Sequence, residues 1–158
     1  VRYNVTQNPN IRFLRNQFSY FEELYSKSYL IHDNSDEIGA VSPQMFEELF
    51  LPELNRIADH HGVLGIHCCA DSKHQWEGLN KVKNLQVLNL NRPMDQLIEA
   101  CGVIRRDIAF LPIPSPEPED IISGAEPWRS RRLILNYTVK DIEHAGGLAK
   151  ELRKVQQL

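Results

Sequence analysis

The sequence lacks any apolar run that approaches the ~20 residues needed to cross a bilayer, and its first residues do not follow the charged-then-apolar order of a signal peptide. We therefore expect no membrane partner and a cytoplasmic location. Cysteine is also scarce, and its three residues, Cys68, Cys69 and Cys101, include an adjacent pair. An odd number and that spacing disfavour a disulfide framework, so we expect reduced thiols.

A large excess of charge of one sign is absent as well, because 18 basic and 21 acidic side chains give a net charge of -3. Nucleic-acid surfaces need Lys and Arg clustered on one face, so we expect no nucleic-acid partner. The one basic cluster consists of Arg129, Arg131 and Arg132. We predict that it is a solvated loop, with binding of an anionic group such as phosphate as the alternative.

Hydrophobic periodicity predicts a chain in which strands alternate with helices. Strands are expected at residues 28–33, 63–69, 85–90, 108–113 and 133–137. Helices are expected at residues 11–25, 42–57, 72–82, 94–101, 119–123 and 140–155. Pro52 should kink the second helix. Such alternation implies parallel strands joined by right-handed crossovers, in one domain that spans residues 1–158.

Two architectures fit this order, namely an open doubly wound sheet and an arc of a barrel. The glycine-rich phosphate loop that a nucleotide-binding open sheet carries after its first strand is missing. Polar residues recur where the strands end, at Asp33, His67, Asn89 and Asn136. Barrel enzymes hold their chemistry at the carboxyl ends of the strands, so the pattern favours an α/β fold with a parallel (β/α) barrel of the TIM-barrel type.

The residues best suited to chemistry are His67 and Cys69, at the end of a predicted strand. Side chains on a strand alternate between its faces, so these two should point one way and Cys68 the other. Zinc accepts imidazole nitrogen and thiolate sulfur, and catalytic zinc sites use about three protein ligands. Two alternatives remain open: a buried, hydrogen-bonded pair in the core, and Cys69 as a nucleophile that a histidine activates.

The acidic loop Asp33–Glu37 follows the first of these strands. It fails as a calcium loop because Ile38 occupies the position that requires glycine. The loop can instead cap the following helix. In the functional alternative, Asp33 is a catalytic residue that hydrogen-bonds or protonates a substrate.

Three segments of the sequence are similar to motifs of a known protein family and occur in the same order along the chain. They are Ser42–Phe46 running to Leu51–Pro52, Ile66–Cys69, and Leu97–Gly102 running to Asp107–Phe110. They resemble the "SPEMF" helix, the "HxC" strand end and a helix-strand unit of the uroporphyrinogen decarboxylase superfamily, over residues 29–158. The resemblance implies a (β/α)8 barrel, of which this chain would supply the C-terminal portion, strands four to eight.

Within that superfamily the HxC pair belongs to zinc-dependent methyltransferases, which move a methyl group between a corrinoid protein and a small thiol. The resemblance implies His67 and Cys69 as zinc ligands and places Asp33 or Asp36 near the substrate. Asn89 and Asn136 are further candidates for substrate binding. The cysteine that this branch usually contributes from its last strand is absent from residues 133–138, which leaves the third ligand open.

Two other functions remain as alternatives: a non-catalytic barrel fragment that binds a corrinoid protein or a tetrapyrrole, and a porphyrinogen decarboxylase. The decarboxylase is less favoured, because residues 133–138 lack the histidine that those enzymes carry near their last strand. Half a barrel also leaves sheet edges open. We therefore expect either a homo-oligomer or a missing N-terminal half.

Overall fold

The centre of the molecule is a parallel sheet of four strands in the order β2-β3-β4-β5. The computed structural model describes residues 2–6 and 30–154, with side chains from residue 35 to residue 153. The strands are β2 (Leu30–Asn34), β3 (Val63–Cys68), β4 (Leu85–Asn91) and β5 (Ala109–Ile113). The predicted α/β class with parallel strands is therefore confirmed.

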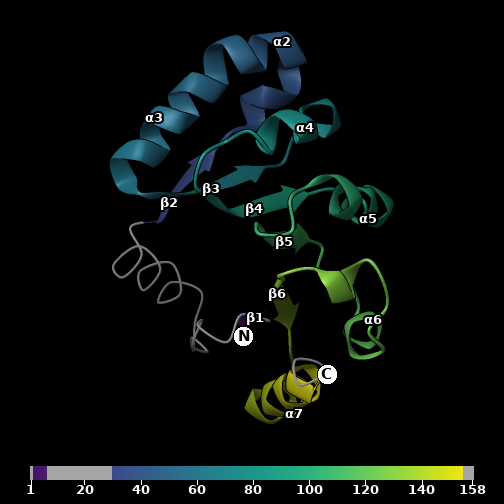
Figure 1. Ribbon diagram of the computed structural model, residues 1–158. Coiled ribbons are helices and arrows are strands. Elements are labelled where there is room, and N and C mark those ends of the chain that lie inside the picture. Colours follow the sequence, from purple (N-terminus) through teal and green to yellow (C-terminus); the bar gives the residue numbers. More distant parts are fainter. Residues whose placement is uncertain (1, 7–29, 155–158) are drawn as a thin grey trace.

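Helices connect these strands and lie together over one face of the sheet (Figure 1). They are α2 (Pro43–Met45), α3 (Leu51–His61), α4 (Trp76–Leu79) and α5 (Met94–Val103). After β5 come α6 (Pro118–Ile122), β6 (Ile134–Thr138) and α7 (Ile142–Lys154). A parallel connection has to cross over the sheet, and the crossover helices cover the face that they cross.

The two faces of the sheet differ because side chains alternate along each strand. Ile66, Leu88 and Phe110 are register partners across β3, β4 and β5, and all three are fully buried in the core under the helices. The next row on the opposite face reads His67, Asn89 and Leu111. The sheet thus presents an apolar layer to the helices and a mixed polar layer to the other side.

The second predicted helix starts as expected. Ser42 caps it, since the Ser42 hydroxyl accepts a hydrogen bond from the Met45 backbone N–H at 3.2 Å. A turn of π-helix, η2 (Phe46–Phe50), then separates α2 from α3. Pro52 has no N–H to donate to the preceding turn, so the irregular turn sits where the sequence predicted a kink.

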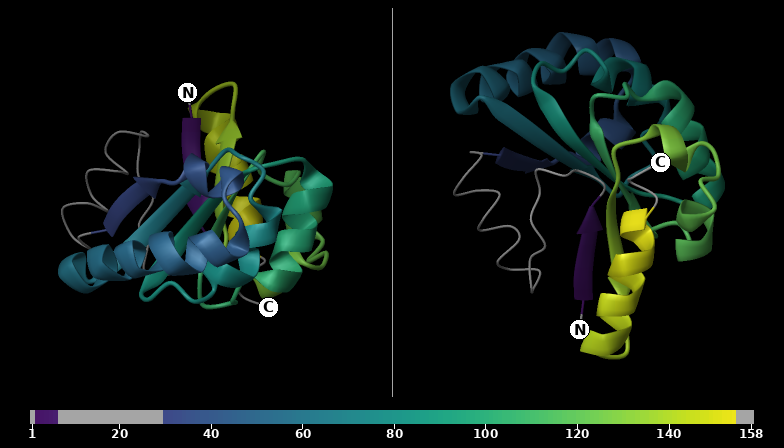
Figure 2. Two further views of the ribbon diagram at one scale, coloured as in Figure 1. Left: turned by 90° about the horizontal axis from the view of Figure 1, so that it is seen from above. Right: turned by 60° about the horizontal axis from the view of Figure 1, so that its bottom comes forward.

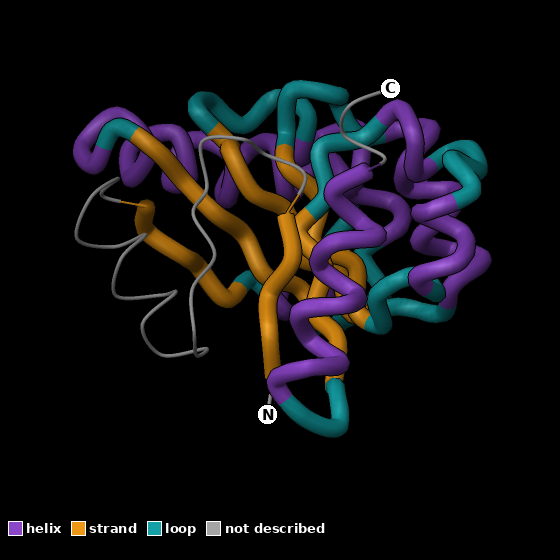
Figure 3. The backbone as a smooth tube through the Cα atoms, turned by 90° about the horizontal axis from the view of Figure 1, so that it is seen from below, coloured by secondary structure: helices purple, strands orange, loops and turns teal. Residues whose placement is uncertain are grey.

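The last predicted strand departs from the expected sheet. Leu133, the residue before β6, forms one parallel bridge with Phe110 of β5, whereas the full ladder of β6 is antiparallel to β1 (Arg2–Thr6). This pair extends away from the four-stranded sheet (Figure 2), and β1 runs alongside β6 (Figure 3). No strand was predicted at residues 2–6, where polar and apolar residues alternate over only a few positions.

Smaller differences concern helix lengths. The helix expected at residues 72–82 is a 3₁₀ turn, η3 (Lys73–Gln75), followed by the four residues of α4. The helix predicted at residues 11–25 lies outside the described residues. In the part of the chain that the structure describes, none of the helices combines the length and the apolar character needed to span a bilayer.

Candidate metal centre

The candidate site lies at the carboxyl ends of β2 and β3. Asp36 opens the 3₁₀ turn η1 (Asp36–Ala40) two residues after β2, His67 is the penultimate residue of β3, and Cys69 directly follows that strand. Neighbouring parallel strands end at the same edge of a sheet. The loops that carry Asp36 and Cys69 therefore meet, although 33 residues separate them along the chain.

His67 and Cys69 converge, as their spacing predicted. His67 Nε2 lies 2.8 Å from Cys69 Sγ. Cys68 points to the opposite face, where it is fully buried in the core. The alternation of side chains along β3 thus places a nitrogen and a sulfur together on the open face of the sheet.

Asp36 supplies a third donor to this pair. The Cys69 backbone N–H donates a hydrogen bond to Asp36 Oδ1. One ligand atom each from Asp36, His67 and Cys69 lies within 4.8 Å of the other two. The sequence placed Asp36 near a substrate but did not identify it as a ligand, because only the pairing of β2 with β3 brings it beside the other two residues.

The donor set fits zinc, which binds nitrogen, sulfur and carboxylate oxygen. Tetrahedral zinc with bonds of about 2.0–2.3 Å holds its ligand atoms roughly 3.3–3.8 Å apart. His67 Nε2 and Cys69 Sγ, at 2.8 Å, would have to move apart by less than about 1 Å. Cys69 is exposed and its loop can make that adjustment, while three protein donors would leave a fourth position for an exogenous ligand.

The second nitrogen of His67 has a protein partner. His67 Nδ1 is hydrogen-bonded to Asn89 Oδ1, and Asn89 Nδ2 donates to the Leu111 carbonyl at 2.7 Å. Asn89 is almost fully buried, with 5% of its surface exposed. The sequence predicted Asn89 as a residue that binds substrate; in the structure its amide oxygen and nitrogen both face protein groups.

The turn that carries Asp36 is fixed by a buried glutamine that sequence reasoning missed. Gln75 Nε2 donates to the Ile38 carbonyl at 3.0 Å and to the Val41 carbonyl at 2.7 Å. Gln75 is 1% exposed, so its amide forms a buried link between η1 and η3. A glutamine at the start of a predicted helix carries no sequence signal for this role.

Gly39 lies in η1, and its lack of a side chain lets η1 pack closely against the loop after β3. A Cβ atom at Gly39 would lie 2.7 Å from Ala70 Cβ and 3.0 Å from the Asp71 carbonyl oxygen. Any larger residue would push η1 away from Ala70 and Asp71. Glycine is therefore required for the approach that sets Asp36 beside Cys69.

The adjacent cysteines have different environments. Burial raises the pKa of the Cys68 thiol, whereas Cys69 is exposed at the open end of the sheet. Asn91, two residues beyond Asn89 on β4, has its amide nitrogen 3.7 Å from Cys69 Sγ. Only Cys69 of the two is thus placed to bind a metal or to react with solutes.

Two predicted site residues are not joined to this cluster by the described contacts. Asp33 is the register partner of Ile66 in β3, and its side chain lies outside the described ones. Asn136 is half-buried on β6, and its backbone N–H donates to the Ser115 hydroxyl at 2.8 Å. Roles in catalysis for Asp33 and in substrate binding for both residues stay predictions.

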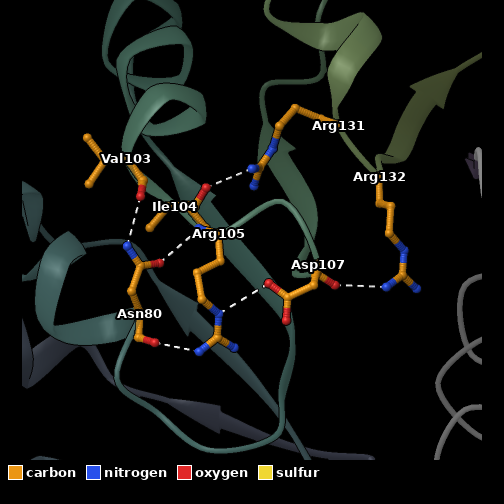
Figure 4. Close-up of polar contacts among 7 residues, drawn as sticks. All are labelled: Asn80, Val103, Ile104, Arg105, Asp107, Arg131 and Arg132. Atoms are coloured by element: carbon orange, nitrogen blue, oxygen red, sulfur yellow. Dashed lines mark hydrogen bonds and ion pairs between the residues drawn. The ribbon is translucent and has the colours of Figure 1, made fainter.

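The prediction that the arginine cluster is a solvated loop is wrong for Arg131. Arg131 is 3% exposed, and it donates from Nη1 to the Ile104 carbonyl at 2.7 Å (Figure 4). Its guanidinium lies 6.0 Å from the centre of the Phe110 ring, and burial lowers its pKa. Arg132 is exposed, as predicted, and donates to the Asp107 carbonyl.

Comparisons of the chain with protein-family models, with curated proteins and with solved structures found no significant match. The resemblance of the three sequence segments to the uroporphyrinogen decarboxylase superfamily thus gains no support from these comparisons. The function has to be inferred from the site.

Proposed function

We propose that Asp36, His67 and Cys69 bind zinc, and that the chain acts as a zinc-dependent methyltransferase between a corrinoid protein and a thiol. The observation that carries the proposal is the convergence of nitrogen, sulfur and oxygen donors within 4.8 Å of one another. The donors come from two neighbouring loops at the carboxyl ends of parallel strands, where α/β enzymes hold their chemistry.

The arrangement of the sheet supports the finer part of the proposal, a (β/α) barrel of which this chain forms strands four to eight. Four parallel strands carry their helices on one face, as an arc of such a barrel would. The other face holds the candidate metal centre. In a closed barrel that face would line the interior, with His67 and Asn89 near its open end.

Bound zinc would supply a Lewis acid that lowers the pKa of a coordinated thiol, so that a thiolate exists at neutral pH. His67 and Cys69 would hold the ion through Nε2 and Sγ, and Asp36 through a carboxylate oxygen. Asp36 also keeps the Cys69 loop in place by accepting its backbone N–H. In the proposed reaction a carbon–sulfur bond would form as the methyl group leaves the corrinoid substrate, the electron pair of the broken bond would stay on that substrate, and the thiol proton would pass to solvent.

Zinc content tests the metal part of the proposal. The full chain is stripped with a chelator, reloaded with zinc, freed of excess ion and analysed for bound metal. We expect about one zinc per wild-type chain and almost none in Cys69→Ala or His67→Ala, because two remaining protein donors hold zinc weakly. Asp36→Asn should bind zinc more weakly than wild type, since it keeps an oxygen but loses the charge.

The matched control is Cys101→Ala, which removes a thiol that is buried away from the cluster and should keep full zinc content. Absence of zinc from reloaded wild-type protein, or undiminished zinc in Cys69→Ala, would contradict the proposal. Zinc-loaded protein is then mixed with methylcobalamin and 2-mercaptoethanesulfonate, and the methylated thiol is measured by mass spectrometry. Zinc binding without this product would leave a metal-binding module that does not transfer methyl groups.

One observation favours a second candidate function, a cysteine nucleophile. Cys69 Sγ is in contact with His67 Nε2, and Asn89 supports the other ring nitrogen, as in Cys-His-Asn enzymes. This use of Cys69 excludes zinc at the same sulfur. A covalent adduct of metal-free protein with an activated ester, formed on Cys69 and lost in His67→Ala, would favour it over the metal centre.

A further inference from the structure

We infer that Asn89 is a positioning residue that sets the tautomer of His67 and so directs the lone pair of Nε2 toward Cys69 and the metal. The effect of Asn89 on zinc binding rests on the proposed metal centre, whereas its effect on the His67 tautomer does not.

The orientation of the Asn89 amide is determined by the main chain. The Leu111 carbonyl can only accept a hydrogen bond, so the atom 2.7 Å from it has to be the NH₂ nitrogen of Asn89. Asn89 Oδ1 therefore points the other way, toward His67 Nδ1. An amide oxygen has no proton to give, so this contact requires His67 to be the donor.

A neutral imidazole carries one proton, and the Asn89 contact places it on Nδ1. Nε2 is then unprotonated, and its lone pair faces Cys69 Sγ at 2.8 Å. Zinc binds histidine through such a lone pair, and a hydrogen bond from the other nitrogen fixes both tautomer and ring orientation. The chain of contacts from Leu111 through Asn89 thus prepares His67 as an Nε2 ligand.

His74 provides an internal comparison. His74 Nε2 lies 2.9 Å from the Val41 carbonyl, which again can only accept. Neutral His74 must therefore carry its proton on Nε2, the opposite tautomer. The two histidines should be distinguishable in one spectrum of the same protein.

The test uses ¹⁵N-histidine-labelled, metal-free full chain at about pH 8, above the usual histidine pKa of roughly 6.5. Long-range proton–nitrogen correlation spectra report which ring nitrogen is protonated, and His67→Gln identifies the His67 signals. We expect the proton on Nδ1 for His67 and on Nε2 for His74. In Asn89→Leu, His67 should lose this preference, while Asn89→Asp, which keeps an acceptor oxygen, should retain it.

The matched control is Asn55→Leu, which removes another half-buried amide that bonds the main chain, on α3 at Lys83, and should leave the His67 tautomer unchanged. Zinc affinity gives the second measurement, through competition with a chromophoric chelator. Asn89→Leu should weaken zinc binding by about 10- to 100-fold relative to wild type, the usual effect of losing a partner behind a metal ligand. Asn55→Leu should leave the zinc affinity unchanged.

The outcomes separate this inference from the proposed function. A wild-type spectrum with the proton on His67 Nε2 would overturn the role of Asn89 even if a variant fails to fold. Equal zinc affinity in wild type and in folded Asn89→Leu would do the same while the zinc site stands. If wild-type protein takes up no zinc, the proposed function fails, and the tautomer measurement still decides the role of Asn89 in His67.

Discussion

The two faces of β3 differ in kind: one is buried in the apolar core, and the other carries the candidate metal centre. Leu64, Ile66 and Cys68 point under the helices and are fully buried. His67, on the other face, and Cys69, just beyond the strand, form the polar cluster with Asp36. The first set contributes stability by removing apolar surface from water, whereas the second keeps its donor atoms accessible.

The candidate site therefore rests on the packed core beneath the sheet, and buried polar contacts hold the loops on either side of it. Gln75 links η1 to η3, and Asn89 links β4 to β5 and to His67. Each link is a buried amide whose hydrogen bonds go to groups in fixed positions. Buried hydrogen bonds of this kind hold a site rigid more effectively than exposed contacts do.

Substitutions on the two faces of the sheet should differ most in their effect on the free energy of unfolding. Leu88→Ala removes a fully buried side chain of β4 and should lower the free energy of unfolding by about 2–5 kcal/mol. Cys69→Ala removes an exposed side chain of the open face and should change the free energy of unfolding by about 0.5 kcal/mol or less. Urea denaturation measures both, and equal losses would show that the open face also carries the fold.

The rate at which each cysteine is alkylated should report how accessible each face of the sheet is to solvent. Cys69 is exposed, while Cys68 and Cys101 are buried. Native protein should react with iodoacetamide at Cys69 at least about 100-fold faster than at the other two, which need local opening worth about 2.7 kcal/mol. Peptide mapping after short exposure gives the rates. Similar rates at all three cysteines would contradict the packing of the helix-covered face.

Alkaline pH should reveal the burial of Cys101. Burial raises the pKa of its thiol from the ordinary value of 9.0 to about 11. The unfolded chain therefore loses this proton first, so the contribution to stability is complete below about pH 9 and disappears as pH rises toward 11. Relative to Cys101→Ala, wild type should lose at most about 2 kcal/mol over that range in urea denaturation. Parallel pH profiles of the two proteins would argue against a buried thiol.

The smallest effect concerns the approach of η1 to the loop after β3. Gly39→Ala should displace the turn that carries Asp36 and weaken zinc binding by several fold, because a Cβ there would meet Ala70. Gly102→Ala is the control, since a Cβ at Gly102 meets nothing within 4 Å. Chelator competition measures both variants. An unchanged affinity in Gly39→Ala would mean that Asp36 is dispensable for the metal.

Much of the fold could be predicted because its signals are local. The four strands of the sheet, the cap at Ser42 and the irregular turn before Pro52 follow from periodicity, side-chain hydrogen bonding and the missing proline donor. The pairing of β1 with β6 could not be predicted, because the two strands lie more than 120 residues apart and neither sequence indicates which strand it will pair with. The burial of Arg131 does not follow from its local sequence, because nothing next to it in sequence shows that it packs against Phe110 and Ile104.

That His67 and Cys69 share a side follows from the local sequence alone, since the two-residue repeat of a strand is a property of the backbone. The sequence also shows that the carboxyl ends of the strands carry polar residues. The place of Asp36 in the donor set and the hydrogen bond of Asn89 to His67 depend on the folded chain, because both contacts cross between strands. Which strands become neighbours depends on packing over the whole core, and no short segment encodes that choice.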